Sequence, residues 1–242
     1  MCTVTYIPSE DGVFLTSNRD EKSWRQQAIP PKVYAYETGS IVFPKDRHAG
    51  GTWIAAHENG HAIVFLNGAF EAHSSTPPYK KSRGIVLLDL LNSQSPYNSF
   101  QSSNLTNIEP FTAIILDQGI LFECRWDGAV KHHETLKTDQ PYIWSSATLY
   151  DRSIREKRSN WFNQWLERTP NITLADILQF HQFTGDGDRH NDLLMNRDGK
   201  VGTVSISCIE LADQKMFMHY LDLQTNERFT HELGLKTIMA DY

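Results

Sequence analysis

Cys2 stands at the start of the chain, where a thiol can serve as the nucleophile of a covalent mechanism. An initial Met followed by a small residue is usually removed, which would leave Cys2 as the first residue. Cys2 would then carry both a thiol and a free α-amine, whose ordinary pKa is about 7.7–8.0. Because the amine can take the thiol proton directly or through water, one residue would supply nucleophile and base. The alternative is that a Cys here is incidental.

A predicted hairpin brings polar residues toward this thiol. Two β-branched segments flank the turn cluster at 8–12, and a turn centred on Glu10 places Cys2 opposite Asn18. A carboxylate beside Cys2 can hold the amine, and a cation favours the thiolate, so Arg19 and Asp20 become candidates. In a regular strand Asn18 and Asp20 share one face and Arg19 points to the other, so both charges reach Cys2 only if the backbone turns. The alternative is a charged strand end with a local ion pair.

The elements that must position these residues can be read along the chain. Apolar residues at helical spacing predict helices, whereas alternating or continuous short apolar runs around Asn-Gly, Gln-Gly and Asp-Gly predict hairpins. One predicted helix is interrupted by Arg158 in its apolar pattern, and Thr173 with Asp176 predicts a capping box at the start of the next. We predict strands in 2–7, 13–18, 52–56, 62–66, 111–116, 120–126, 193–196, 201–211 and 216–221, and helices in 83–91, 149–166 and from 173.

The composition is that of an ordinary globular protein: 242 residues, 40% hydrophobic, 21% charged and a formal charge of -6. One α+β domain spanning 1–242 is the simplest arrangement. The acidic balance disfavours nucleic acid as a partner, and no apolar run is long enough for a membrane span. Three Cys without CxxC spacing, and no signal-peptide pattern, predict a reducing, cytoplasmic location. Although His and Asp are numerous, they lack metal-ligand spacing, so no metal site is predicted.

Several motifs together resemble the NRDE family, the family of the transport-and-Golgi-organisation proteins. These motifs are Met-Cys-Thr at the start, Ser-Asn-Arg-Asp-Glu at 17–21, Ala-Gly-Gly-Thr-Trp at 49–53, Leu-Asn-Gly at 66–68, Ser-Arg-Gly at 82–84, Ser-Ser-Ala at 145–147 and Gly-Thr at 202–203. They span almost the whole chain. The resemblance implies an Ntn-hydrolase-like αββα four-layer sandwich of mainly antiparallel sheets, similar to choloylglycine hydrolases and penicillin V acylases.

The resemblance also implies roles for individual residues. Cys2 would be the nucleophile, Asp20 would hold its amine, and Asn67 would help to stabilise the oxyanion. Arg19 belongs to the family's own motif, whereas the hydrolase relatives carry an Arg near the place of Ser17. Ser146 stands where the family has an Asn that completes the oxyanion hole, and Val204 stands where members often have an Arg. Gly51, Thr52 and Trp53 are predicted to form a pocket wall, the alternative being a tight loop with a core Trp.

Two functions are consistent with these residues. The first is an N-terminal-cysteine amidohydrolase that needs no cofactor and acts on a non-peptide C–N bond of a small acylated molecule. The second is a non-catalytic protein that uses the same pocket to bind and move haem or acyl-CoA and lipid, activities linked to proteins it resembles. Intact Cys2, Asp20 and Asn67 favour the first, whereas Ser146 and Val204 favour the second. The sequence indicates neither the ligand nor the oligomeric state.

Overall fold

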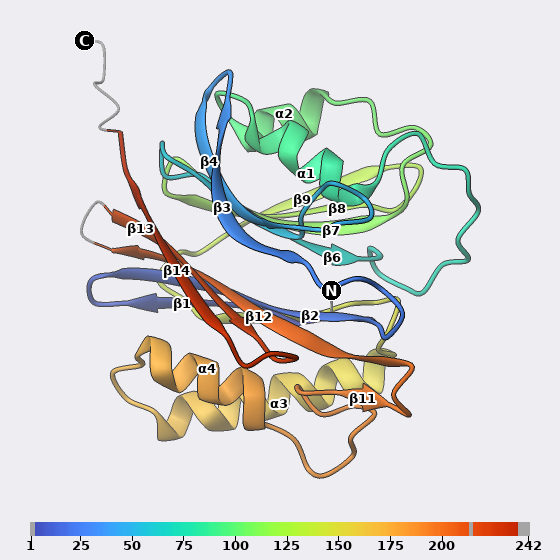
Figure 1. Ribbon diagram of the computed structural model, residues 1–242, viewed down its shortest axis with the longest axis vertical. Coiled ribbons are helices and arrows are strands. Elements are labelled where there is room, and N and C mark those ends of the chain that lie inside the picture. Colours follow the sequence, from blue (N-terminus) through green and yellow to red (C-terminus); the bar gives the residue numbers. More distant parts are fainter. Residues whose placement is uncertain (1–2, 213–214, 237–242) are drawn as a thin grey trace.

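The computed structural model describes residues 3–212 and 215–236, so Cys2 lies outside the described residues. Two antiparallel sheets pack face to face, and a pair of helices covers the outer face of each sheet (Figure 1). The predicted αββα sandwich is therefore confirmed. Among the described residues, no helix has both the length and the apolar character of a membrane span.

Sheet A contains both strands of the N-terminal hairpin at its middle. Its strand order is β10-β1-β2-β12-β13-β14, and β11 pairs with β12. The long strand β2 is hydrogen-bonded along both edges, because β1 pairs with one edge and β12 with the other. The strands of sheet A are β1 (Thr3–Ser9), β2 (Gly12–Lys22), β10 (Tyr142–Ser145), β11 (Asn196–Arg197), β12 (Val201–Ala212), β13 (Lys215–Asp222) and β14 (Arg228–Gly234).

Sheet B is an up-and-down meander in which every strand pairs with its neighbours in sequence. Residues of β6 and β7 are buried almost without exception, because sheet A covers one face and helices cover the other. Burial on both faces explains why these strands are continuous apolar runs. The strands of sheet B are β3 (Ile29–Tyr36), β4 (Gly39–Lys45), β5 (Ile54–His57), β6 (Ala62–Asn67), β7 (Phe111–Asp117), β8 (Ile120–Trp126) and β9 (Lys131–Leu136).

The helices begin at residues whose side chains cap the free N–H groups of the first turn. Thr173 and Asp176 form the predicted capping box, which is confirmed. The predicted start of a helix at Leu149 is wrong, because the Asp151 carboxylate accepts the N–H of Ile154 and the helix begins after it. The helices are α1 (Arg83–Leu91) and α2 (Pro96–Ser102) over sheet B, and α3 (Arg152–Arg168) and α4 (Leu174–Phe183) over sheet A.

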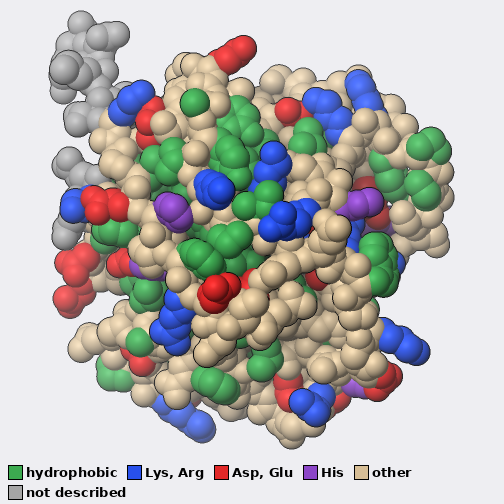
Figure 2. All heavy atoms as spheres, viewed as in Figure 1, with side chains coloured by type: hydrophobic (Ala, Val, Ile, Leu, Met, Phe, Trp, Pro, Cys, Tyr) green, Lys and Arg blue, Asp and Glu red, His purple; other side chains and the backbone are tan. Residues whose placement is uncertain are grey.

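Three apolar clusters hold the four layers together. The cluster between the sheets includes Val4, Leu15, Trp53 and Met218. A second cluster lies between sheet B and its two helices, and a third lies between sheet A and α3 and α4. Figure 2 shows that acidic and basic side chains are interspersed on one face of the outer surface. The buried apolar side chains are thus concentrated between the layers.

The predicted register of the N-terminal hairpin is wrong by one residue. Its turn is the pair Glu10 and Asp11, because Ser9 already faces Gly12. Thr3 rather than Cys2 therefore faces Asn18, and Thr3 also faces Ser145 on the other side. The polar motif at 17–21 nevertheless lies beside the start of β1. The hairpin brings the N-terminal end of the chain and that motif to the same end of sheet A.

Candidate active site

Asp20 is a buried carboxylate near the C-terminal end of β2. It is 4% exposed and accepts two hydroxyl hydrogen bonds from distant segments. The Thr203 hydroxyl donates to Oδ1 at 2.6 Å, and the Tyr150 hydroxyl donates to Oδ2 at 2.9 Å. Thr203 faces Asp20 on β12, immediately before a register shift in that strand pair. These contacts fix a negative charge two residues beyond Asn18, the partner of Thr3.

Asn18 lies on the face of sheet A that α3 and α4 cover. Its amide donates to the backbone carbonyls of His181 and Leu193, at 3.1 and 2.8 Å. Its side-chain oxygen accepts from Nδ1 of His181 at 2.6 Å, and the Thr5 hydroxyl donates to Nε2 of the same ring at 2.8 Å. Since every polar atom of the Asn18 side chain is engaged, the structure places Asn18 in a bridge between β2 and α4.

The bridge contains a titratable group, and we expect it to make stability depend on pH. Burial, together with a smaller effect of the charge of Arg158, lowers the pKa of His181 to about 3. In the unfolded chain the His181 ring binds a proton as the pH falls through about 6.5, whereas in the folded protein the ring stays neutral there. This contribution to stability is complete above pH 6.5 and is lost as the pH falls toward 3. We expect the free energy of unfolding to fall by about 2 kcal/mol between pH 6.5 and 5 from His181 alone.

Urea unfolding at a series of pH values measures this loss. Burial also lowers the pKa of His57 and His61, so the wild-type slope has several contributors. The comparison with His181→Gln isolates one of them, because the variant cannot take up the proton in either state. Equal slopes for the variant and the wild type would contradict a neutral His181.

Arg19 points to the opposite face of β2, between the two sheets. It is 4% exposed, and its guanidinium contacts Asp46 at 2.6 Å and lies 4.5 Å from the ring centre of Trp53. Asp46 is also bound by Arg25 at 2.8 Å. Burial by itself raises the pKa of Asp46, but the N–H of Ala49 and the two guanidinium charges outweigh burial and lower it. Arg19 is therefore held in a charged cluster, with its flat face against a predicted pocket wall.

A cavity of about 720 Å³ opens beside this cluster. Five of the predicted site residues line it: Arg19, Gly51, Thr52, Trp53 and Asn67. The loop before α1 and the first residues of that helix form another part of the wall. Gly51 is needed for this packing, because a Cβ there would lie 2.4 Å from the carbonyl carbon of Gly84. The two glycine-containing motifs at 49–53 and 82–84 thus meet at one wall of the cavity.

Asn67 and Ser146 meet where the ends of β6 and β10 approach each other. The Ser146 hydroxyl donates to the backbone carbonyl of Asn67 at 2.8 Å and lies 2.9 Å from the Thr148 hydroxyl. Ser146 is fully buried, whereas Asn67 lines the cavity. A hydroxyl has one proton to donate. In this arrangement that proton is donated to the Asn67 carbonyl, so Ser146 stabilises the end of β6 where Asn67 lies.

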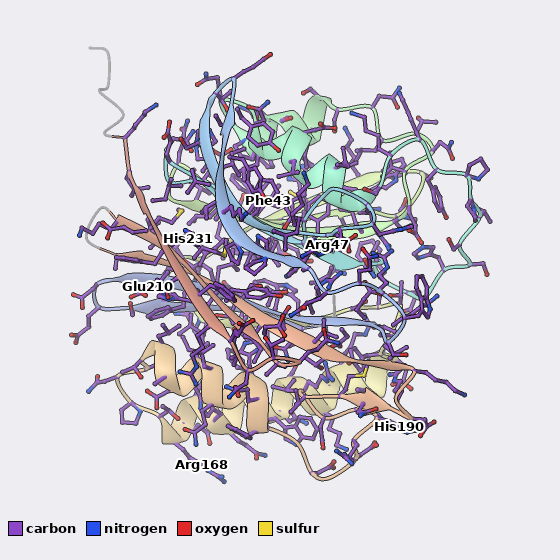
Figure 3. The ribbon with its side chains drawn as sticks, in the orientation of Figure 1. Phe43, Arg47, Arg168, His190, Glu210 and His231 are labelled. Carbon is purple, nitrogen blue, oxygen red and sulfur yellow. The ribbon has the colours of Figure 1, made fainter. Side chains whose placement is uncertain are left out.

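A larger cavity of about 940 Å³ lies at the opposite end of sheet A. It is lined by the turn of the N-terminal hairpin, the segment before α4 and the end of β12, and it includes Glu210. In Figure 3, Glu210 is at the left, whereas Arg47, which lies between two lining residues of the smaller cavity, is right of centre. Because none of the predicted site residues lines the larger cavity, we take the smaller one as the candidate active site.

Sequence reasoning missed several residues that shape this site. Tyr150 and Asp46 had no local motif to mark them, and Arg158 was visible only as an interruption of a helical pattern. Thr203 was the exception, because it belongs to the Gly-Thr motif whose role the sequence left unstated. Pairing across β2 and β12 supplies that role, since it puts Thr203 opposite Asp20.

Comparison with solved structures supports the fold. An N-acylethanolamine-hydrolyzing acid amidase ortholog from Caenorhabditis elegans superposes with a TM-score of 0.58 and 11% identity, covering 86% of this chain and 92% of that chain. A mutant of the conjugated bile acid hydrolase from Clostridium perfringens gives a TM-score of 0.52 and 11% identity over the full length of both chains. A second variant of that hydrolase gives 0.50 and 12%, covering 99% of this chain and all of that one. At such identities these likenesses show an Ntn-hydrolase type of fold.

Comparison of the sequence with protein families identifies the family of the chain. No curated protein sequence matches it significantly. The family model described as Transport and Golgi organisation 2, however, matches residues 1–205. This match covers the motifs of the N-terminal hairpin, the cavity wall and the Gly-Thr of β12. The chain therefore belongs to the Transport and Golgi organisation 2 family.

Proposed function

We propose that this protein is an N-terminal-cysteine amidohydrolase that acts on a non-peptide C–N bond of a small acylated molecule. The observation that carries the proposal is the buried Asp20 carboxylate, held by two hydroxyls at the end of sheet A where β1 begins. Cys2 directly precedes Thr3, and Thr3 pairs with a residue two positions from Asp20. A fixed carboxylate in this position is suited to hold the α-amine of an N-terminal Cys.

The chemistry follows from these parts once Met1 has been removed. The α-amine takes the thiol proton, and the thiolate attacks the amide carbonyl carbon to form a tetrahedral oxyanion. The intermediate collapses, the C–N bond breaks, and the leaving nitrogen receives the proton from the α-ammonium. Water then adds to the thioester with the amine again acting as base, and the C–S bond breaks. The acid product leaves, and the Cys2 thiolate regains its proton from the α-ammonium. Asp20 orients the ammonium throughout, and Asn67 is the candidate donor to the oxyanion.

The cavity is consistent with a small molecule as substrate. Its volume, about 720 Å³, is in the range of ligand sites in proteins. Trp53 and Tyr79 offer aromatic surface, and Arg19 is fixed against the first of them. Because the wall at Gly51 and Gly84 is closely packed, we expect this side to be rigid. Such a wall suits the orientation of an acyl group before attack.

One observation favours the second candidate, which is non-catalytic binding of haem or acyl-CoA. The cavity wall carries five Lys and Arg residues against three Asp and Glu, so its side chains have a cationic excess. Haem and acyl-CoA both carry anionic groups, which such a wall attracts. The use of the Ser146 proton on Asn67 points the same way, because that proton is not directed to an oxyanion. Under this alternative the same cavity binds its ligand without turnover.

Intact-mass spectrometry of the protein from its native host, with and without a short iodoacetamide pulse at pH 7, separates the candidates. We expect Met1 to be absent and Cys2 to be alkylated first. Cys124 and Cys208 are internal controls, because burial raises the pKa of each thiol to about 12 and keeps both protonated. Cys2→Ser is the matched variant and should show no fast label. If Met1 is retained, or if Cys2 is alkylated no faster than the buried thiols, the hydrolase proposal is wrong. Titration with haem and acyl-CoA would then test the second candidate.

A further inference from the structure

Arg158 is a buried cation inside the layer between sheet A and α3. It is 1% exposed and is among the largest fully buried side chains of the described residues. Within residues 3–212 and 215–236, no carboxylate forms an ion pair with it; its partners are neutral oxygens and an aromatic face. Burying an arginine without a carboxylate is costly compared with an apolar side chain of similar size. The fold therefore keeps this charge at a cost in stability.

The contacts of Arg158 lead to the start of β1 and to Asp20, on the face of sheet A that α3 and α4 cover. Nη1 donates to the hydroxyl of Thr3, the residue that follows Cys2. The guanidinium carbon lies 3.7 Å from the ring centre of Tyr150, whose hydroxyl donates to Asp20 at 2.9 Å. One side chain thus touches the start of β1 and, through one aromatic ring, the carboxylate that is proposed to hold the amine.

The remaining contacts of Arg158 fix its own position. Nε and Nη2 donate to the carbonyl of Asn191 at 3.2 and 3.0 Å, and Nη2 also donates to the carbonyl of Asp192 at 2.7 Å. These carbonyls belong to the segment between α4 and β11. Because the guanidinium is planar and rigid, these hydrogen bonds fix the direction of Nη1 and the position of the guanidinium over the Tyr150 ring. The two carbonyls therefore hold the guanidinium in place, and the guanidinium in turn contacts Thr3 and Tyr150.

We infer that Arg158 is a positioning residue of the N-terminal catalytic centre, acting on Thr3 directly and on Asp20 through Tyr150. The inference rests on the proposed function. A cation stacked on a phenol ring strengthens the phenol as a hydrogen-bond donor, which fixes Asp20 more firmly. The same buried charge favours the thiolate over the thiol and the free amine over the ammonium. Other charged or titratable groups around this network are Asp20, His181 and Arg197.

The test measures the rate of Cys2 alkylation by iodoacetamide from pH 5 to 9, with the site of labelling read by mass spectrometry. The variants are Arg158→Met, which removes the charge, and Arg158→Lys, which keeps it. The matched control is Arg152→Lys, an exposed arginine of the same helix that pairs with Glu156. We expect Arg158→Met to raise the midpoint of the pH profile by about one unit and to slow labelling at pH 7 about tenfold. Arg158→Lys should recover part of this shift, and the control should match the wild type.

Two further variants cut one link each and keep Arg158 in place. Thr3→Val removes the acceptor of Nη1, and Tyr150→Phe removes the donor to Asp20 while keeping the stacked ring. We expect each to shift the midpoint or to slow labelling at pH 7 about threefold. These two variants decide the matter if Arg158→Met does not fold.

The outcomes separate the inference from the proposed function. If Cys2 of the wild type is no more reactive than Cys124 and Cys208, the hydrolase proposal is wrong and the inference falls with it. If wild-type Cys2 is reactive but the profiles of folded Arg158→Met, Thr3→Val and Tyr150→Phe superimpose on it, Arg158 is only a packing residue and the inference alone is overturned.

Discussion

Asp20→Asn is expected to abolish most hydrolysis while leaving the fold intact. The amide has almost the shape of the carboxylate and can still contact the hydroxyls of Tyr150 and Thr203, which both donate and accept. It cannot hold an ammonium by charge, so the α-amine loses its orientation as base and acid. We expect the rate of amide cleavage to fall by about 10²- to 10⁴-fold, the range associated with losing an acid–base group or its orienting carboxylate.

The measurement uses a panel of acyl aminomethylcoumarin amides of increasing chain length, with circular dichroism and thermal unfolding to check the fold. Asp11→Asn is the matched control, because Asp11 is an exposed carboxylate in the turn at the other end of the same hairpin. Cys2→Ala sets the background rate. Cleavage by Asp20→Asn within a few-fold of the wild type would exclude Asp20 from the mechanism. If the wild type cleaves the amides no faster than Cys2→Ala does, the result would favour the binding function instead.

The sequence predicted the fold and the neighbourhood of the site because both depend on ordered local motifs. Asn-Gly and Gln-Gly turns, continuous apolar strands and the Thr173 cap are all encoded within a few residues, and the structure confirms them. The motifs at 49–53 and 82–84 were predictable as glycine-rich segments. Their contact at one cavity wall was not, because it depends on how α1 packs on sheet B.

What the sequence could not supply was the orientation of neighbouring residues in one motif. Asn18, Arg19 and Asp20 are consecutive, yet the first bridges to α4, the second points between the sheets and the third binds hydroxyls from two other segments. Strand alternation predicts that Arg19 faces away from Asn18 and Asp20, but not what covers each face. Whether the hairpin turns at one residue or at two also decided which residue faces Asn18, and a shift of one residue changes every pair.

Partners that come from far along the chain are the second gap. Tyr150 is 130 residues from Asp20, and Arg158 is 155 residues from Thr3. In the sequence, a buried arginine in an amphipathic helix shows only as an interruption of the apolar pattern. Its partners are identified only when α3 is seen packed on the outer face of sheet A (Figure 1). Long-range polar contacts of this kind depend on topology, which no window of sequence contains.

Asp46→Ala is expected to give the largest loss of stability. Asp46 accepts from Arg19 at 2.6 Å, from Arg25 at 2.8 Å and from the N–H groups of His48 and Ala49 at 2.9 and 2.8 Å. The variant leaves Arg19 almost fully buried, with only Glu21 at 3.5 Å as a carboxylate partner among the described residues. Removing one partner of a buried pair costs about 3–5 kcal/mol, because the other charge stays out of water. We expect the free energy of unfolding at pH 7 to fall by that amount.

Urea unfolding with linear extrapolation measures this loss, and two comparisons identify its cause. The double variant Arg19→Met, Asp46→Leu removes both charges and should be less destabilised than Asp46→Ala, because no unpaired cation remains. The pKa of Asp46 is lowered in the folded protein, so its contribution is complete above the unfolded value near 3.9 and is lost as the pH falls through the folded value. The gap between wild type and Asp46→Ala should therefore narrow below about pH 4. A double variant as unstable as Asp46→Ala would show that lost packing, rather than an unpaired Arg19, causes the loss.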